Sequence, residues 1–168
     1  PTNETIYPIA SVTKTMTGYL GAMAVLEGKM KLDDDIRKYL KGRYPNLTYQ
    51  DKPIKIKHLL THTSRLPAEI VGLESYLEKG DMEGALAYVK SYSKDQFFND
   101  LKSIALDTIP GTRYLYSSNG TNLLGYILED IYKTSYEDLL ETHIFKKAGM
   151  KNTKLELDKD QKEKLSNG

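Results

Sequence analysis

A serine and a lysine stand three residues apart in the segment IASVTKTMTG, residues 9–18. If a helix begins near Ser11, the side chains of Ser11 and Lys14 leave it on the same side, with Cβ atoms about 5–6 Å apart. A serine hydroxyl becomes a nucleophile when a neighbouring base takes its proton, and a lysine whose pKa is lowered can be that base. The first turn of a helix also offers backbone N–H groups to an attacked carbonyl. The spacing is therefore compatible with acyl transfer at Ser11.

The same two residues have a purely structural interpretation. Serine is a favoured N-cap, and a lysine three residues later is common as a solvated side chain on an amphipathic helix. A four-residue Ser-x-x-Lys match also arises often by chance. The pattern alone leaves both interpretations open, so the rest of the chain must decide between them.

Helical periodicity dominates the elements that must position this pair. Apolar residues at three- and four-residue intervals predict a helix over residues 9–28 that Gly28 ends. Turn-forming stretches with Gly, Ser and charged residues predict several shorter helices within residues 74–106. Two further helices are predicted over residues 119–132 and 136–149. Because strand signals are few, we expect a mainly α chain.

The composition limits the kinds of partner. The 168 residues suit one folded unit, and 24 basic residues against 23 acidic residues give a net charge of +1. We therefore expect a small partner and no nucleic acid. The absence of cysteine excludes disulfides, thiolate zinc ligands and cysteine nucleophiles. No apolar run approaches the roughly 18 residues of a transmembrane segment. The sequence begins at Pro1 without a leader, so any export signal is expected to have been removed or to lie outside it.

Five segments resemble, in family order, segments of the serine β-lactamases and penicillin-binding proteins. The resemblance is to the class C β-lactamase group, with its D-alanyl-D-alanine carboxypeptidases and family VIII-type esterases, and covers residues 5–153. The segments are IYPIASVTKTMTG, GKMKLDDDIRKYL, IKIKHLLTHTSRLP, IPGTRYLYSSNGTNLLGYILE and IFKKAGMKNT. The resemblance implies the helical lobe of an α+β serine β-lactamase/transpeptidase-like fold with most of the sheet missing. It also implies a serine hydrolase without a cofactor that forms an acyl-enzyme on Ser11.

The second motif of this family is Tyr-x-Asn, and its matching positions here are Tyr116 and Ser118. The resemblance implies that Tyr116 shares the base and acid roles with Lys14, and that the third residue binds the substrate amide. Ser118 replaces the usual asparagine and has a shorter reach, which puts the substrate preference in doubt. Assigning Asn119 instead would break the family spacing, in which the tyrosine stands nine residues before Gly125.

Three further features are a pair of histidines, the segment HTSRLP and the family's third motif. His58 and His62 have the spacing of a helical metal pair, but no Glu follows the first histidine and no third ligand is evident, so we expect no metal. The segment resembles the family's structural HTSGLP, with Arg65 in place of glycine, which suggests an altered loop. The third motif, Lys or His then Thr or Ser then Gly, is absent; in the family its strand supplies a substrate clamp and one oxyanion N–H group.

We expect residues 1–153 to form the helical lobe with its nucleophile helix, and residues 154–168 to form a charged, mobile tail. The missing sheet would leave apolar faces exposed, notably along residues 9–26, so a homo-oligomer or a missing segment is expected to cover them. The resemblance implies a β-lactam, a D-alanyl or peptidoglycan-derived peptide, or a small ester as substrate, and a periplasmic or extracellular location for the full-length protein. This chain alone is expected to be poorly active.

Two alternatives remain open from the sequence. One is a non-catalytic relative that binds peptidoglycan or a protein partner, which the departures at Ser118 and Arg65 would suit. The other is a helical interaction domain with an accidental likeness to the family, which the ordered segments argue against. The sequence does not choose among lactamase, peptidase and esterase, because the same nucleophile serves all three.

Overall fold

Helices make up most of the regular secondary structure in the computed structural model, which describes residue 2 and residues 4–166. The strands within this part of the chain form one short antiparallel ribbon, β1 (Thr48–Tyr49) and β2 (Lys52–Pro53), in which Thr48 lies opposite Pro53. The expectation of a mainly α chain is confirmed. None of the described helices is long and apolar enough to cross a membrane.

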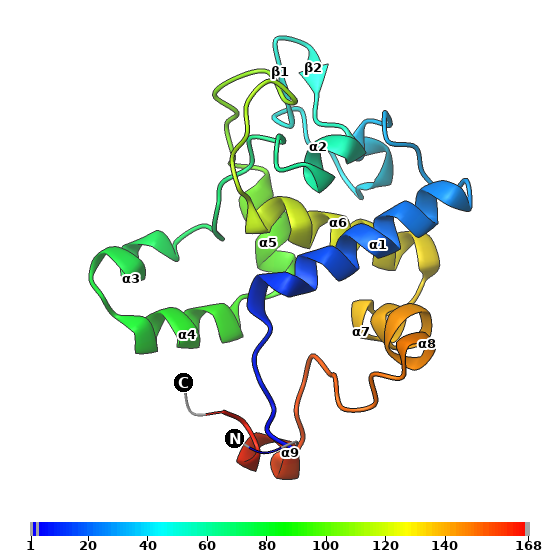
Figure 1. Ribbon diagram of the computed structural model, residues 1–168. Helices are drawn as coiled ribbons and strands as arrows, with labels where there is room; N and C mark the ends of the chain where they lie inside the picture. Colours follow the sequence, from blue (N-terminus) through cyan, green and yellow to red (C-terminus); the bar gives the residue numbers. More distant parts are fainter. Residues whose placement is uncertain (1, 3, 167–168) are drawn as a thin grey trace.

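In chain order the helices are α1 (Thr13–Leu26), α2 (Ile56–Leu60), α3 (Glu74–Glu78), α4 (Met82–Ser91), α5 (Lys94–Leu101), α6 (Ser118–Tyr132), α7 (Tyr136–Leu140), α8 (Lys146–Ala148) and α9 (Lys159–Glu163). Two 3-10 turns, η1 (Ala10–Val12) and η2 (Ile36–Tyr39), and one π-helical turn, η3 (Glu141–Phe145), complete them. Short turns join α3 to α4, α4 to α5 and α6 to α7, whereas longer segments lie between α1 and α2, between α2 and α3, between α5 and α6 and between α8 and α9 (Figure 1).

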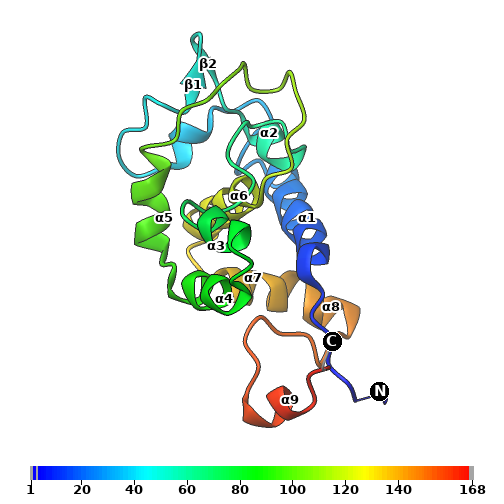
Figure 2. The same ribbon diagram turned by 90° about the vertical axis from the view of Figure 1, so that its left-hand side faces the viewer.

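Helices α1 and α6 lie side by side at the centre of the molecule (Figures 1 and 2). Gly21 allows a close approach, since a Cβ atom there would lie 3.3 Å from the Leu60 side chain and 3.5 Å from that of Leu124. The buried core around these helices includes Leu20 and Ala24 of α1; Leu59 of α2; Phe97 and Leu101 of α5; Leu123, Leu124, Ile127 and Leu128 of α6; and Leu139 and Leu140 of α7. This packing fixes the start of α1 relative to the start of α6.

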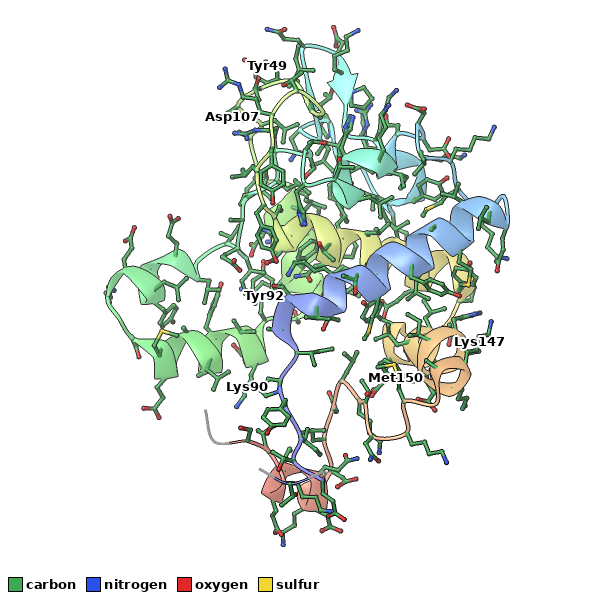
Figure 3. The ribbon with its side chains drawn as sticks, in the orientation of Figure 1. Tyr49, Lys90, Tyr92, Asp107, Lys147 and Met150 are labelled. Atoms are coloured by element: carbon green, nitrogen blue, oxygen red, sulfur yellow. The ribbon has the colours of Figure 1, made fainter. Side chains whose placement is uncertain are left out.

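Helices α3 and α4 form a hairpin that projects from the rest of the molecule (Figures 1 and 2). A small separate core of Ile70, Leu73 and Ala85 holds the hairpin together. Tyr92, labelled in Figure 3, lies where the hairpin joins α5, and its hydroxyl donates a 2.7 Å hydrogen bond to Asp100. The predicted run of short helices within residues 74–106 is thus present as α3, α4 and α5.

The first and the last described segments of the chain, at residues 4–6 and 164–166, lie side by side near α9 (Figure 1). Ile6 and Leu165 form a parallel bridge, and Lys164 Nζ donates a 2.8 Å hydrogen bond to Glu4. The division into residues 1–153 and 154–168, and the mobility of the second segment, stay predictions. Residues 1, 3, 167 and 168 of those two segments lie outside the described residues.

Candidate active site

The proposed nucleophile lies in the turn that leads into α1. Ser11 is in η1, and Lys14 is in the first turn of α1, with Lys14 Nζ donating a 3.2 Å hydrogen bond to Ser11 Oγ. The sequence predicted a helix start at residue 9, but the α-helix begins at Thr13. Ala10 takes a left-handed φ of +44°, and the 3-10 turn η1 occupies residues 10–12. A left-handed conformation at a residue other than glycine is strained, and such strain is concentrated at functional sites.

Tyr116 reaches Ser11 from the long loop before α6. Its hydroxyl donates a 2.7 Å hydrogen bond to Ser11 Oγ, and Lys14 Nζ lies 5.1 Å from the centre of the Tyr116 ring. The hydrogen bonds with Lys14 and then Ser11 lower the pKa of Tyr116 below its usual value. Tyr116 is 37% exposed, so solvent and substrate can reach this residue. Ser11 Oγ is therefore hydrogen-bonded to two titratable side chains.

The first turn of α6 is anchored to residues 67–69. Ser117 is the N-cap: its Oγ accepts from Gly120 N–H at 3.0 Å and donates to Pro67 O at 2.7 Å. The Asn119 amide donates to Pro67 O at 3.2 Å and to Glu69 O at 2.6 Å. Since Asn119 is only 2% exposed, its amide is committed to holding this loop. Asn119 thus has a structural role in this arrangement.

Ser118 begins α6 directly after Tyr116 and Ser117, and its backbone N–H donates to Ala68 O at 2.7 Å. Ser118 is half-buried and directly follows the loop that carries Tyr116. The structure thus brings Ser11, Lys14 and Tyr116 into contact and places Ser118 at the adjoining helix start. The substrate-binding role of Ser118 stays a prediction.

One cavity, of about 250 Å³, adjoins Lys14 between α1, α6 and α7. Hydroxyl groups and aromatic rings share its wall, and Thr17 and Tyr136 form a 2.6 Å hydrogen bond there. The lining residues are Thr13, Lys14, Thr17, Thr121, Asn122, Gly125, Tyr126 and Tyr136. The cavity gives the lysine a free volume beside α1 that a small chemical group could enter.

Arg65 supports the loop that carries the candidate site. It has a left-handed φ of +67°, which is the conformation that the family's glycine would adopt without strain. Its Nε donates to Asp107 Oδ1 at 2.9 Å and its Nη2 to Asp107 Oδ2 at 2.6 Å. Figure 3 labels Asp107 on the long loop that leads to α6. The departure at Arg65 therefore ties the HTSRLP loop to the Tyr116 loop.

His58 and His62 do not face a common metal position. The Nδ1 atom of His58 accepts from Lys55 N–H at 3.1 Å, and the Nδ1 atom of His62 accepts from Ser117 N–H at 3.2 Å. Among the described residues, no three His, Cys, Asp or Glu side chains cluster in a way that could hold a metal ion. Each histidine is instead bound to backbone.

His62 is the residue near the site whose contact the sequence analysis did not find. Its ring lies against the ring of Tyr116, with centroids 4.6 Å apart and an angle of 32° between the planes. The sequence did place His62 in a segment that resembles the family, HTSRLP, but it predicted only a structural role for that segment. The contact joins segments far apart in the chain, so no local spacing revealed it.

The chain belongs to the Beta-lactamase family, whose model matches residues 1–168. It is 30% identical over 153 residues to the D-alanyl-D-alanine-carboxypeptidase/endopeptidase AmpH of Escherichia coli K12, covering 91% of this chain and 37% of that protein. It is 32% identical over 156 residues to a putative D-alanyl-D-alanine carboxypeptidase of the same organism, covering 90% of this chain and 34% of that protein. The chain thus spans about a third of these relatives.

Solved structures agree with the family assignment. A β-lactamase/D-alanine carboxypeptidase from Yersinia pestis, complexed with citrate, superposes with a TM-score of 0.82 at 28% identity, over 98% of this chain and 45% of that chain. A class C β-lactamase superposes with a TM-score of 0.74 at 26% identity, over 98% of this chain and 41% of that chain. The resemblance found in the sequence is confirmed, and the chain forms the helical part of the β-lactamase-like fold.

Proposed function

We propose that the complete protein containing this chain is a serine acyl hydrolase that forms an acyl-enzyme on Ser11. One observation carries the proposal: Ser11 Oγ is within hydrogen-bonding distance of both Lys14 Nζ, at 3.2 Å, and Tyr116 OH, at 2.7 Å. An N-cap serine needs neither neighbour, whereas a nucleophile needs a group that takes its proton. The family and the names of its members support hydrolase activity.

In the proposed acylation step, Ser11 Oγ attacks the substrate carbonyl carbon and its proton passes to the Lys14–Tyr116 pair. The bond between the carbonyl carbon and the leaving group then breaks, and the leaving group takes a proton from the same pair. Water later attacks the ester on Ser11, the serine regains its proton, and the acid product departs. Lys14 and Tyr116 are coupled through Ser11, so the proton belongs to the pair rather than to one residue.

The lowered pKa of Tyr116 suits this role, because a phenol of ordinary acidity is a poor proton acceptor near neutral pH. The hydrogen bond with Lys14 and the positive charge of Lys14 favour the phenolate form of Tyr116. The substrates that we propose are a β-lactam, a D-alanyl peptide or a small ester, since each presents a carbonyl with a suitable leaving group. A periplasmic or extracellular location suits such substrates.

Covalent labelling of the complete gene product tests the proposal. A fluorophosphonate probe and a penicillin should each add one adduct by intact mass, and peptide mapping should place it on Ser11. The Ser11→Ala variant should lose the adduct. The matched control is Ser91→Ala, which removes an exposed serine from α4 and should label like the parent.

Two outcomes would remove the assignment. An adduct on another residue, or equal labelling of the Ser11→Ala variant, would show that a different group is the nucleophile. No labelling by either probe would favour a non-catalytic relative that binds peptidoglycan or a protein partner. A well-folded parent, verified by thermal unfolding, is needed for each comparison.

A further inference from the structure

His62 follows the end of α2 in a conformation that is uncommon for its residue type. Its φ is +53°, in the left-handed region, directly after the C-cap residue Thr61. Glycine or asparagine would hold this conformation at lower cost. Strained backbone positions are concentrated at functional sites, so the contacts of the His62 side chain are of interest.

His62 holds the segment 114–117 at several successive points. Its carbonyl oxygen accepts from Leu115 N–H at 2.8 Å, and its Nδ1 accepts from Ser117 N–H at 3.2 Å. Between these two bonds, its ring lies against the Tyr116 ring, with centroids 4.6 Å apart, and the centroid of the Tyr114 ring lies 6.0 Å from that of His62, with an angle of 76° between the two planes. The residue that carries the candidate proton-transfer hydroxyl is therefore held on both sides by one histidine.

The hydrogen bond to Ser117 defines the form of the imidazole. A backbone N–H can only donate, so Nδ1 of His62 carries no hydrogen and Nε2 carries the single hydrogen of a neutral ring. The groups facing this ring are Lys14 from α1 and Tyr114 and Tyr116 from the loop before α6. Burial, and after it the positive charge of Lys14, lower the pKa of His62. The acceptor is thus maintained at neutral pH.

Two other histidines of the chain show what is particular to this contact. His58 also accepts a backbone N–H at Nδ1, but its ring packs on the backbone at Gly111, where a Cβ atom would lie 2.7 Å from Nε2. His143 contacts Tyr132, but the ring centroids are 5.9 Å apart. Only at His62, among these three described histidines, do the acceptor and the close ring contact act on the same short segment.

Tyr116 needs such support because its own bonds are few. Its side chain has two rotatable bonds and is partly exposed, and its hydroxyl must remain within 2.7 Å of Ser11 on a different element. We propose that His62 is a positioning residue that holds the Tyr116 ring so that its hydroxyl stays against Ser11 Oγ. This inference rests on the proposed function of Ser11. A tyrosine free to turn away would seldom be aligned for proton transfer.

Three substitutions at His62 separate its contributions in the complete gene product. His62→Asn keeps an acceptor near the position of Nδ1 and tolerates the left-handed φ, but removes the ring. His62→Phe keeps the ring and removes the acceptor, and His62→Gly removes both without backbone strain. We expect the rate of Ser11 acylation by a fluorophosphonate to fall about tenfold in each of the first two variants. In His62→Gly it should fall on the order of a hundredfold.

The pH profile and a second mutation distinguish positioning from general loss of structure. The bonds to Lys14 and Ser11 lower the pKa of Tyr116, so loosening them should move the acidic limb of the acylation profile to higher pH. In a Tyr116→Phe background, His62→Gly should cause little further loss, because the hydroxyl that it positions is gone. His143→Asn is the matched control and should acylate like the parent.

Parent-like acylation of His62→Gly, or an equal loss in the parent and the Tyr116→Phe backgrounds, would overturn the positioning role. A loss that only follows the fraction of folded protein, with an unmoved pH profile, would overturn it as well. Absence of labelling in the parent would remove the proposed function and this inference with it, whereas normal parent labelling with unchanged variants would remove the inference alone.

Discussion

The Tyr116 hydroxyl donates a 2.7 Å hydrogen bond to Ser11 Oγ, although 105 residues separate the two along the chain. The packing of α1 against α6 brings the two helix starts together, and residues 67–69 fix the first turn of α6. Lys14 completes the group from within α1. These three residues form the acyl-transfer site that we propose, so each of them can be replaced and the effect measured.

Lys14→Arg should nearly abolish acylation of Ser11 while leaving the fold intact. The guanidinium keeps the positive charge, but it stays protonated and cannot take the serine proton. We expect the rate of acylation by a penicillin to fall roughly a thousandfold, which is typical for loss of a proton-transfer group. Time-resolved intact mass measures the rate. An arginine variant as fast as the parent would give Lys14 a structural role and leave Tyr116 as the acceptor.

Ser118→Asn should change the preference among substrates more than the reactivity of Ser11. The longer amide side chain reaches further from the start of α6 and can donate to a substrate carbonyl that the serine does not reach. The measurement compares rates on a β-lactam, a D-alanyl peptide and an aryl ester before and after the change. Unchanged rates on all three substrates would place Ser118 outside the substrate site. An equal drop on all three would instead indicate a damaged Tyr116 loop.

Arg65→Gly should destabilise the complete protein less than Arg65→Ala. Both variants lose the bonds to Asp107, but only glycine relieves the strain of the φ of +67°. The left-handed conformation costs a residue with a Cβ atom about 1 kcal/mol, which sets the expected difference between the two variants. Denaturant unfolding monitored by circular dichroism measures it. Equal stability of the two variants would show that the loop relaxes out of this conformation.

His58→Asn should reduce the loss of stability at mildly acidic pH. Burial, followed by the charges of Lys57 and Lys55, lowers the pKa of His58 in the folded protein. Below about pH 6.5, His58 binds a proton more readily in the unfolded chain than in the folded protein. The free energy of unfolding is therefore highest above that pH and decreases as the pH falls. Asparagine keeps an acceptor for Lys55 N–H and binds no proton. Unfolding at about pH 7.5 and about pH 5.5 tests this, and a parent-like difference would contradict it.

The 168-residue chain by itself should be a poor catalyst. The family resemblance places one oxyanion donor on a strand after the helical lobe, and loss of such a donor typically costs on the order of a hundred- to a thousandfold in rate. Val12, Tyr19 and Leu26 are exposed along the first helix, which favours self-association. Assays with a chromogenic β-lactam and an aryl ester, together with the solution mass, test both expectations. Full turnover by a monomeric chain would contradict them.

Much of the helical architecture follows from local patterns. The apolar spacing predicted a helix ended by Gly28, and α1 ends at Leu26 with Gly28 at a φ of +70°. The predicted helix over residues 119–132 is α6, which begins one residue earlier. These elements were predictable because helix geometry, caps and glycine conformations depend on residues within a few positions of one another.

The sequence by itself determined the pairing of Ser11 with Lys14, because a helical turn brings residues three apart to the same side. Only the tertiary structure decided that Tyr116 contacts Ser11 and that His62 lies against Tyr116. It also decided that the Asn119 amide is hydrogen-bonded to the backbone of residues 67–69. These contacts join segments separated by tens of residues. Their geometry depends on how α1, α2 and α6 pack and on backbone hydrogen bonds between loops, and no spacing along the chain encodes it.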